Sequence, residues 1–314
     1  MNRGVSTTPW GVWKQPQRAR VRLLRAVTVK PKDGIVMGRA GAAQTLGAVV
    51  LPSPLSRLRQ ALADAAGAWI FYSVLPAWPG VAPRFERIAR FAPLVGLTLG
   101  GCQGLLWWLT ALWLPAEARA LLVLALGLWL SGGLHADGVM DTADGLAAGK
   151  RALAAMEDSR VGASGVQAFV QVLLLKLAGL LCLAVLSPVA VAVALGFTGW
   201  SARIAPLLAM HAFPYLKEGE GTAGFHREHR RGLRRELLPA LLLLPGLIAA
   251  LVCTWPAWGV ACLAGLAALV PVVLVPRWIG RRLGGHSGDT YGACVEWGEA
   301  LGLLLMGLVA RAAA

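Results

Sequence analysis

The sequence predicts an all-α protein, a polytopic membrane helical bundle with about seven transmembrane helices and a re-entrant or in-plane helix near its N-terminus. Composition is the first observation behind this prediction. Hydrophobic residues make up 57% of the 314 residues, charged residues only 15%, and the mean hydropathy is +0.62. Soluble domains average about 45–50% apolar and about 25% charged residues. The second observation is a series of apolar stretches, most of them near the ~20 residues that cross a bilayer.

The N-terminal region differs from the rest of the chain. Residues 1–60 hold eleven Lys and Arg and a single acid, Asp33, with scattered Pro and Gly and no steady period. We therefore predict a basic, disordered extension over residues 1–55 and an integral-membrane domain over residues 56–314. A transit peptide, or a start at Met37, stays open as an alternative. Beside apolar spans, a basic arm favours contact with anionic lipid, and we expect no nucleic-acid binding.

The apolar stretch 62–79 is short and is interrupted by Pro76 and Pro79, which indicates an in-plane or re-entrant helix. Longer apolar stretches follow it. Transmembrane helices are predicted at about 91–114, 117–134, 165–186, 188–210, 237–255, 257–276 and 297–313.

Basic residues cluster in every second connection between these stretches, while the alternate connections, such as Thr254 to Trp258, carry almost no charge. The positive-inside rule makes the basic side cytoplasmic. We therefore expect a protein of the cytoplasmic (inner) membrane. Three polar segments, at about 131–165, 211–236 and 277–296, should meet on its cytoplasmic face.

The first polar segment concentrates acids. Asp137, Asp141 and Asp144 are spaced four and then three residues apart, which places them on one face of a helix. Such carboxylates repel one another unless a divalent cation binds them. A solvated acidic face is the ordinary alternative. The chain has only 16 Asp and Glu, however, and this cluster begins where an apolar stretch ends. These two features move the interpretation toward a metal site, and the solvated face stays open as an alternative.

Several strings in this sequence resemble one enzyme family. They are GGLHADGVMDTADGLAAG followed by MEDSRVGASG, PLVGLTLG at Pro93–Gly100, and GGHSGDTYGACVEWGE at Gly284–Glu299. Together they resemble the adenosylcobinamide-GDP ribazoletransferase, or cobalamin synthase, family over roughly residues 60–305. The first 50 or so residues depart from the family, and Ser287 stands where Thr is usual.

The resemblance implies a reaction and a cofactor. Adenosylcobinamide-GDP and α-ribazole, or its 5′-phosphate, would be the substrates, and adenosylcobalamin (or its 5′-phosphate) and GMP the products. Mg²⁺ is the implied cofactor, with Asp137, Asp141 and Asp144 as its expected ligands. Bound metal and basic side chains would neutralise the charge that develops on the phosphates.

Three further candidate catalytic residues lie around the acidic cluster. His135 is a candidate acid–base or metal-supporting group, or else a structural residue. Asp158 is a candidate ligand if a turn at Gly149 brings it back toward Asp144, or else a partner of Arg160. Arg160 itself could hold a phosphate or form that salt bridge.

The last polar segment supplies Asp289 as a candidate catalytic residue. The glycine-rich turn around it, with Gly285, Ser287 and Gly288, is a candidate substrate-binding element, since such turns offer backbone N–H groups to phosphate. Helix packing is the alternative role for these glycines.

Charged residues also fall inside the predicted spans. Arg203 is a candidate phosphate contact. Glu296 and Glu299 should pair or line a polar cavity, and Lys176 should pair with an intramembrane acid or snorkel.

Other interpretations stay open. The acidic string lacks the Arg that a CDP-alcohol phosphotransferase motif carries after its first Asp-Gly, and EDSR at 157–160 fits an aromatic prenyltransferase poorly. A transporter would spread its acids through the mid-membrane. The sequence leaves the lower base, the number of metal ions and the oligomeric state open, and a homodimer is one option.

Overall fold

The computed structural model describes residues 53–217, 229 and 231–314. Within these residues the chain is helical, and its one β-type contact is an isolated bridge between Tyr215 and His286. Nearly all of the predicted N-terminal extension, and most of the basic loop at 217–235, lie outside the described residues. The predicted fold class is confirmed for the part of the chain that the structure covers.

Six described segments are long and apolar enough to cross a membrane, and a seventh crossing arises if a bent helix pair counts as one span. The six are the 3₁₀ turn η1 (Ile88–Phe91) with α3 (Ala92–Leu109), α7 (Ala163–Leu183), α8 (Pro188–Ala202) with α9 (Ala205–Ala212), α11 (Leu233–Thr254), α12 (Trp258–Leu283) and α13 (Gly288–Ala312). The bent pair joins α4 (Ala116–Ser131) to the helical segment Leu134–Glu157 at 90°. The prediction of about seven spans is therefore confirmed.

Several boundaries differ from the prediction. The first described helix covers Pro54–Tyr72 where 62–79 was predicted, and α12 continues to Leu283 where the prediction ended at 276. The last helix begins at Gly288, about nine residues before the apolar stretch suggested, because Ser287 and Thr290 form a capping box there. The hydropathy pattern did not reveal this start, because Asp289, Glu296 and Glu299 make the first turns of the helix less apolar. The fourth predicted span breaks at Arg203, between α8 and α9.

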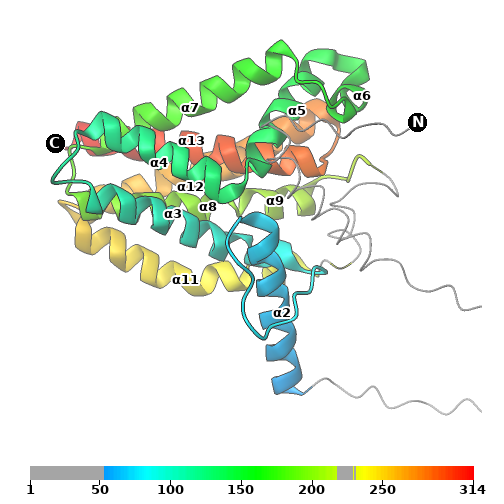
Figure 1. Cartoon of the computed structure of the whole chain (residues 1–314), viewed down its shortest axis with the longest axis horizontal. Helices are drawn as coiled ribbons and strands as arrows, with labels where there is room; N and C mark the ends of the chain where they lie inside the picture. Colours follow the sequence, from blue (N-terminus) through cyan, green and yellow to red (C-terminus); the bar gives the residue numbers. More distant parts are fainter. Residues whose placement is uncertain (1–52, 218–228, 230) are drawn as a thin grey trace, which may run out of the picture.

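Figure 1 shows the long helices running side by side, with α2 (Pro54–Tyr72) crossing their direction at one end of the bundle. Because α2 is one continuous helix that crosses the others, its course is compatible with the predicted in-plane or re-entrant helix. Its C-terminal half is buried around Asp64, which pairs with Arg90 at 2.9 Å and Arg84 at 3.5 Å. Its first turns, including Leu55 and Leu58, are exposed.

Close helix crossings at small residues hold the bundle together. A Cβ placed on Gly96 of α3 would lie 2.1 Å from the carbonyl oxygen of Gly199 in α8, and one on Gly307 of α13 would lie 2.6 Å from that of Gly179 in α7. Membrane helices pack in this way because van der Waals contact replaces the hydrophobic driving force that lipid removes.

Within the described residues, three polar connections gather at one end of the bundle, which we call the polar end. It contains α5 (Leu134–Ala148), α6 (Ala152–Glu157), the segment 213–217 and the turn 284–287, whereas the C-terminus lies at the opposite end (Figure 1). Three segments that are distant in sequence thus meet at one side of the bundle, as the charge pattern predicted.

Candidate active site

A sharp turn positions the acidic helix. Gly132 and Gly133, which end α4 and begin α5, have φ values of 61° and 70°. This left-handed region is costly for residues with a Cβ, so two glycines permit a turn that other residues resist. The chain bends by 90° there. Helix α5 consequently lies at the polar end and carries Asp137, Asp141 and Asp144 with it.

The acidic helix crosses the start of α13 at very short range. A Cβ on Gly138 would lie 2.4 Å from the carbonyl oxygen of Asp289 and 3.1 Å from the Cα of Gly292. Only a glycine at position 138 lets the two backbones approach this closely. The crossing therefore brings Asp289, from the third polar segment, alongside the aspartates of α5.

The capping box at the start of α13 orients Asp289. The Ser287 hydroxyl accepts a hydrogen bond from the Thr290 N–H and contacts the Asp289 carboxylate at 3.2 Å. Thr290 Oγ1 in turn accepts from the Ser287 N–H at 2.8 Å. Both hydroxyl residues are fully buried. Ser287 therefore caps a helix and holds a carboxylate, and Gly288 is the first residue of that helix.

Gly285 makes room for a neighbouring segment. A Cβ at this position would lie 2.6 Å from the carbonyl oxygen of Pro214. The structure thus gives this glycine a packing role; it does not test the predicted contacts of Gly285, Ser287 and Gly288 with substrate.

The carboxylates of this site crowd one another. Burial raises the pKa of Asp141 to about 7, and the nearby charges of Asp137 and Asp289 act in the same direction. Lys217 opposes them, and Asp144 contributes least. Crowded carboxylates from two helices are the donors that a hard divalent cation prefers, since such a cation relieves their repulsion.

Asp144 has another partner. Its two carboxylate oxygens accept hydrogen bonds from the N–H groups of Gly162 and Gly165, at 2.7 Å and 2.8 Å. Gly162 is the N-cap residue of α7, so Asp144 caps that helix from outside and ties it to α5. Of the acids near Asp141, Asp289 is thus better placed than Asp144 to complete a ligand set.

The donor types fit Mg²⁺, but the side chains do not enclose an ion as they stand. Within the described residues, no three His, Cys, Asp or Glu side chains converge closely enough to hold a metal. The Lys217 ammonium lies instead 3.2 Å from Asp289 Oδ2. The site therefore has the charge for a divalent cation and would need side-chain rotation to surround one.

Asp158 and Arg160 form a surface ion pair. The chain turns at Gly149, whose φ is 58°, and α6 packs back onto α5, as the sequence suggested. Arg160 then contacts the Asp158 carboxylate through Nε at 3.0 Å and Nη2 at 2.7 Å. The Arg160 guanidinium lowers the pKa of that carboxyl to about 2. Of the two roles that the sequence left open for this pair, the structure shows the salt bridge.

His135 lies beneath the site. It is 4% exposed, its ring stacks on Tyr72 with centroids 6.2 Å apart, and its Nδ1 has no hydrogen-bond partner among the described residues. This burial places the imidazole away from solvent, behind the acidic face of α5.

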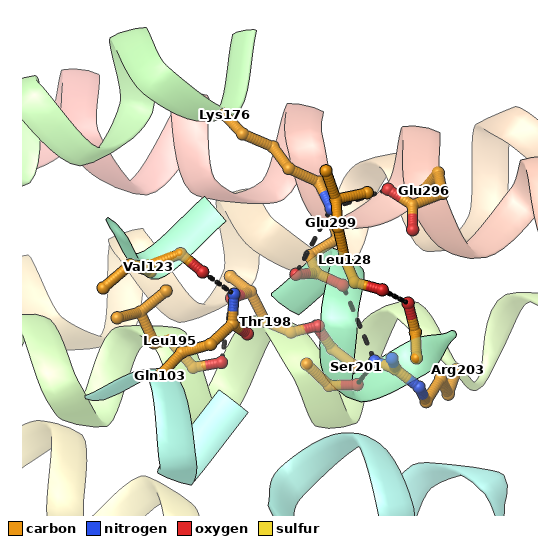
Figure 2. A network of polar contacts seen from close by, with 12 residues as sticks. Gln103, Val123, Leu128, Lys176, Leu195, Thr198, Ser201, Arg203, Glu296 and Glu299 are labelled. Carbon is orange, nitrogen blue, oxygen red and sulfur yellow. Dashed lines mark hydrogen bonds and ion pairs between the residues drawn. The ribbon is translucent and has the colours of Figure 1, made fainter. Parts of the chain in front are cut away.

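Arg203 belongs to an ionic network inside the bundle, which Figure 2 shows from close by. Its Nη1 donates to the Gly199 carbonyl oxygen at 2.8 Å and lies 3.6 Å from Glu299. Lys176 Nζ lies 2.7 Å from Glu296 and 3.5 Å from Glu299. Glu296 and Glu299 therefore pair with basic side chains, as expected. The expected pairing of Lys176 with an intramembrane acid is also confirmed.

This ionic network is buried, and Arg203 is buried with it. Its side chain is 5% exposed and faces Glu299, so Arg203 has a structural role in the bundle, and its predicted phosphate contact stays a prediction. A cavity of about 20 Å³, large enough for one water, borders the network next to Gln103 and Ser131. The network joins α13 to α7 and α8 and thereby fixes the helix that presents Asp289.

The sequence did not predict the contacts of Lys217 at the polar end. The basic loop that begins at Lys217 was expected to lie on anionic lipid, to draw in nucleotide phosphates, or both, and the structure places Lys217 beside Asp289 and 3.8 Å from Glu157. The sequence carries no local signal for these contacts, because Lys217 and Asp289 are 72 positions apart.

Comparison with known proteins agrees with the motifs. A family model described as Cobalamin-5-phosphate synthase matches residues 64–307. A protein of Prochlorococcus marinus (strain MIT 9313) named adenosylcobinamide-GDP ribazoletransferase is 56% identical over 256 residues, which are 79% of this chain and 96% of that protein. A protein of the same name from Trichormus variabilis is 37% identical over 244 residues, 76% of this chain and 93% of its own. No solved structure matches the chain at a significant level.

Proposed function

The chain belongs to the cobalamin-5-phosphate synthase family, and from that premise we propose that it is an adenosylcobinamide-GDP ribazoletransferase. The family match covers the acidic helix, the ionic network and the capped start of α13. The observation that carries the proposal is the crossing of α5 and α13 at Gly138, which gathers Asp137, Asp141 and Asp289 at one place.

The proposed reaction is a displacement at phosphorus. A hydroxyl oxygen of α-ribazole, or of its 5′-phosphate, forms a bond to the phosphorus attached to the cobinamide arm. The bond from that phosphorus to the bridging oxygen breaks, and the bridging oxygen leaves with GMP. The hydroxyl proton is released to a carboxylate or to solvent. Adenosylcobalamin or its 5′-phosphate is the second product.

We propose that Asp137, Asp141 and Asp289 hold Mg²⁺, with Asp144 fixing the position of the helix that carries two of them. When bound, the ion would supply positive charge against the phosphate oxygens of the substrate. Asp137 is exposed, whereas Asp141 and Asp289 are half-buried, so the three form a surface that a nucleotide can reach from solvent.

The orientation of the site in the membrane is also part of the proposal. The polar end carries Arg84, Arg87 and Arg90 next to the start of α3, and Lys150 and Arg151 after α5. The positive-inside rule favours the cytoplasmic side of an inner membrane for such an end, where nucleotide substrates are made.

Purified protein in detergent or nanodiscs tests the function directly. Incubation with adenosylcobinamide-GDP, α-ribazole 5′-phosphate and Mg²⁺ should release GMP and form a corrinoid product in equal amounts, and EDTA should stop both. A folded sample that makes neither product under these conditions would refute the assignment. If GMP release continued unchanged in EDTA, only the proposed role of Mg²⁺ would be refuted, and the transferase assignment would stand.

A further inference from the structure

A short strap of backbone joins the segment after α9 to the turn before α13. The Leu216 N–H donates to the His286 carbonyl oxygen at 2.8 Å, and the His286 N–H donates to that of Pro214 at 2.9 Å. The pairing is the isolated bridge between Tyr215 and His286. Lys217 follows the strap directly, so its backbone position is fixed relative to α13.

The turn that receives the strap is itself firmly held. The His286 side chain is fully buried, and its Nε2 contacts the Pro276 carbonyl oxygen at 3.0 Å while Nδ1 contacts Thr290 Oγ1 at 2.9 Å. Its ring also stacks on Tyr291 at 5.7 Å with 17° between the planes. Burial lowers the pKa of His286 to about 4, so the imidazole is neutral at physiological pH. His286 therefore adds no charge to the site, and Lys217 is the cation that the strap positions there.

The Lys217 ammonium lies among acids. Its Nζ is 3.2 Å from Asp289 and 3.8 Å from Glu157. The side chain is 18% exposed, so the cation is partly shielded and yet reachable from solvent. An ammonium has three donors on one atom, which allows it to keep a carboxylate contact and to donate to a phosphate oxygen as a second partner.

A purely neutralising role explains this arrangement less well. Ion pairs at a protein surface contribute little to stability, and any nearby Lys or Arg could supply one. Here two backbone hydrogen bonds, a glycine at 285 and a buried histidine determine where a single Lys stands. Such precise positioning favours a side chain that takes part in the reaction.

We propose that Lys217 is a catalytic residue that binds the diphosphate of the nucleotide substrate and stabilises the charge on the departing GMP. The inference rests on the proposed function and adds to it a residue and a role. Negative charge grows on the bridging oxygen as its bond to phosphorus breaks, and a cation fixed beside that oxygen lowers the barrier. Asp289 and Glu157 hold the ammonium in place before the nucleotide arrives.

Three variants test the proposal: Lys217→Ala, the charge-preserving Lys217→Arg, and the matched control Lys150→Ala, which removes an exposed cation at the same end of the bundle. The measurements are kcat and KM for each substrate, GMP affinity by calorimetry with and without Mg²⁺, and thermal stability. We expect Lys217→Ala to lower kcat/KM for the nucleotide substrate about 100-fold and to weaken GMP binding about 10-fold. The KM for α-ribazole 5′-phosphate and the melting temperature should stay near those of the wild type. Lys217→Arg should recover part of the GMP affinity, and Lys150→Ala should match the wild type.

The inference is overturned if Lys217→Ala keeps wild-type GMP affinity and stays within threefold of the wild type in kcat/KM. It is also overturned if that variant loses thermal stability and binds both substrates equally poorly, since that pattern describes a purely structural strap. The proposed function fails by a different result: wild-type protein that binds GMP but makes no corrinoid product.

Discussion

Helix α13 carries acids in two settings that differ in charge balance. At its first turn, Asp289 joins Asp137 and Asp141, and these acids face one described cation, Lys217. Two turns further along, Glu296 and Glu299 face two cations, Lys176 and Arg203, inside the bundle.

The difference follows from the surroundings of each cluster. Unpaired charge in the low dielectric of a bundle interior is very costly, so the inner acids must be neutralised by the protein itself. At the polar end, water lowers that cost, so acids there do not need buried cations from the protein to neutralise them. One helix thus uses acids for packing in its interior portion, and we propose that it uses acids for ligand binding at its end. Substitutions in each portion test this distinction.

The largest effect on activity should come from the polar end. Asp141→Asn removes the most crowded carboxylate, so transferase activity should fall about 10³-fold or more. The same change relieves repulsion and should raise the free energy of unfolding by about 1 kcal/mol after allowance for solvent screening. Product formation and thermal unfolding in detergent measure the two effects. An Asp141→Asn variant that is inactive because it is less stable would contradict the comparison.

The largest effect on stability should come from the interior. Lys176→Met leaves Glu296 and Glu299 with Arg203 alone, so the free energy of unfolding should fall by about 3–5 kcal/mol. The double variant Lys176→Met/Glu296→Gln restores neutrality and should recover much of this loss. Unfolding in mixed micelles compares the two. Equal destabilisation of the single and double variants would show that shape, and not charge balance, governs this part of the bundle.

An intermediate effect is expected where the two helices cross. The added Cβ of Gly138→Ala would push α5 away from Asp289, costing about 1–3 kcal/mol as overpacking does. Activity should fall about 10- to 100-fold, because the carboxylates of the two helices would separate. Gly101→Ala is the control, since a Cβ there meets nothing within 4 Å. Loss of activity in both variants would mean that any added methyl group disturbs the bundle.

The smallest effect should come from the exposed pair on the loop after α6. Arg160 is 87% exposed and pairs with Asp158, so Arg160→Ala should change kcat/KM by less than about threefold. Steady-state kinetics with both substrates provides the measurement. A loss greater than tenfold would instead favour the other interpretation of the sequence, in which Arg160 holds a substrate phosphate.

Periodicity and hydropathy predicted the outline of the fold because a bilayer imposes strong local requirements. A span needs about 20 apolar residues, and Lys or Arg must avoid one side, so the order and direction of helices follow from the chain itself. The spacing of Asp137 and Asp141 likewise reveals a shared helix face. The motifs at Pro93–Gly100, around Asp141 and around Asp289 together indicated the family.

The sequence did not predict which side chains contact one another across different helices. Nothing local indicates that Asp144 caps α7, that Arg203 turns inward to Glu299, or that Lys217 stands beside Asp289. The Asp144 contact depends on how two glycines bend α4 into α5, and the Lys217 contact depends on the strap that holds the segment before it against the turn at His286. The sequence by itself determined which segments lie in the membrane and which acids share a face. The tertiary structure decided which of those charges meet, because an ion pair forms by proximity in space and leaves no periodic trace along the chain.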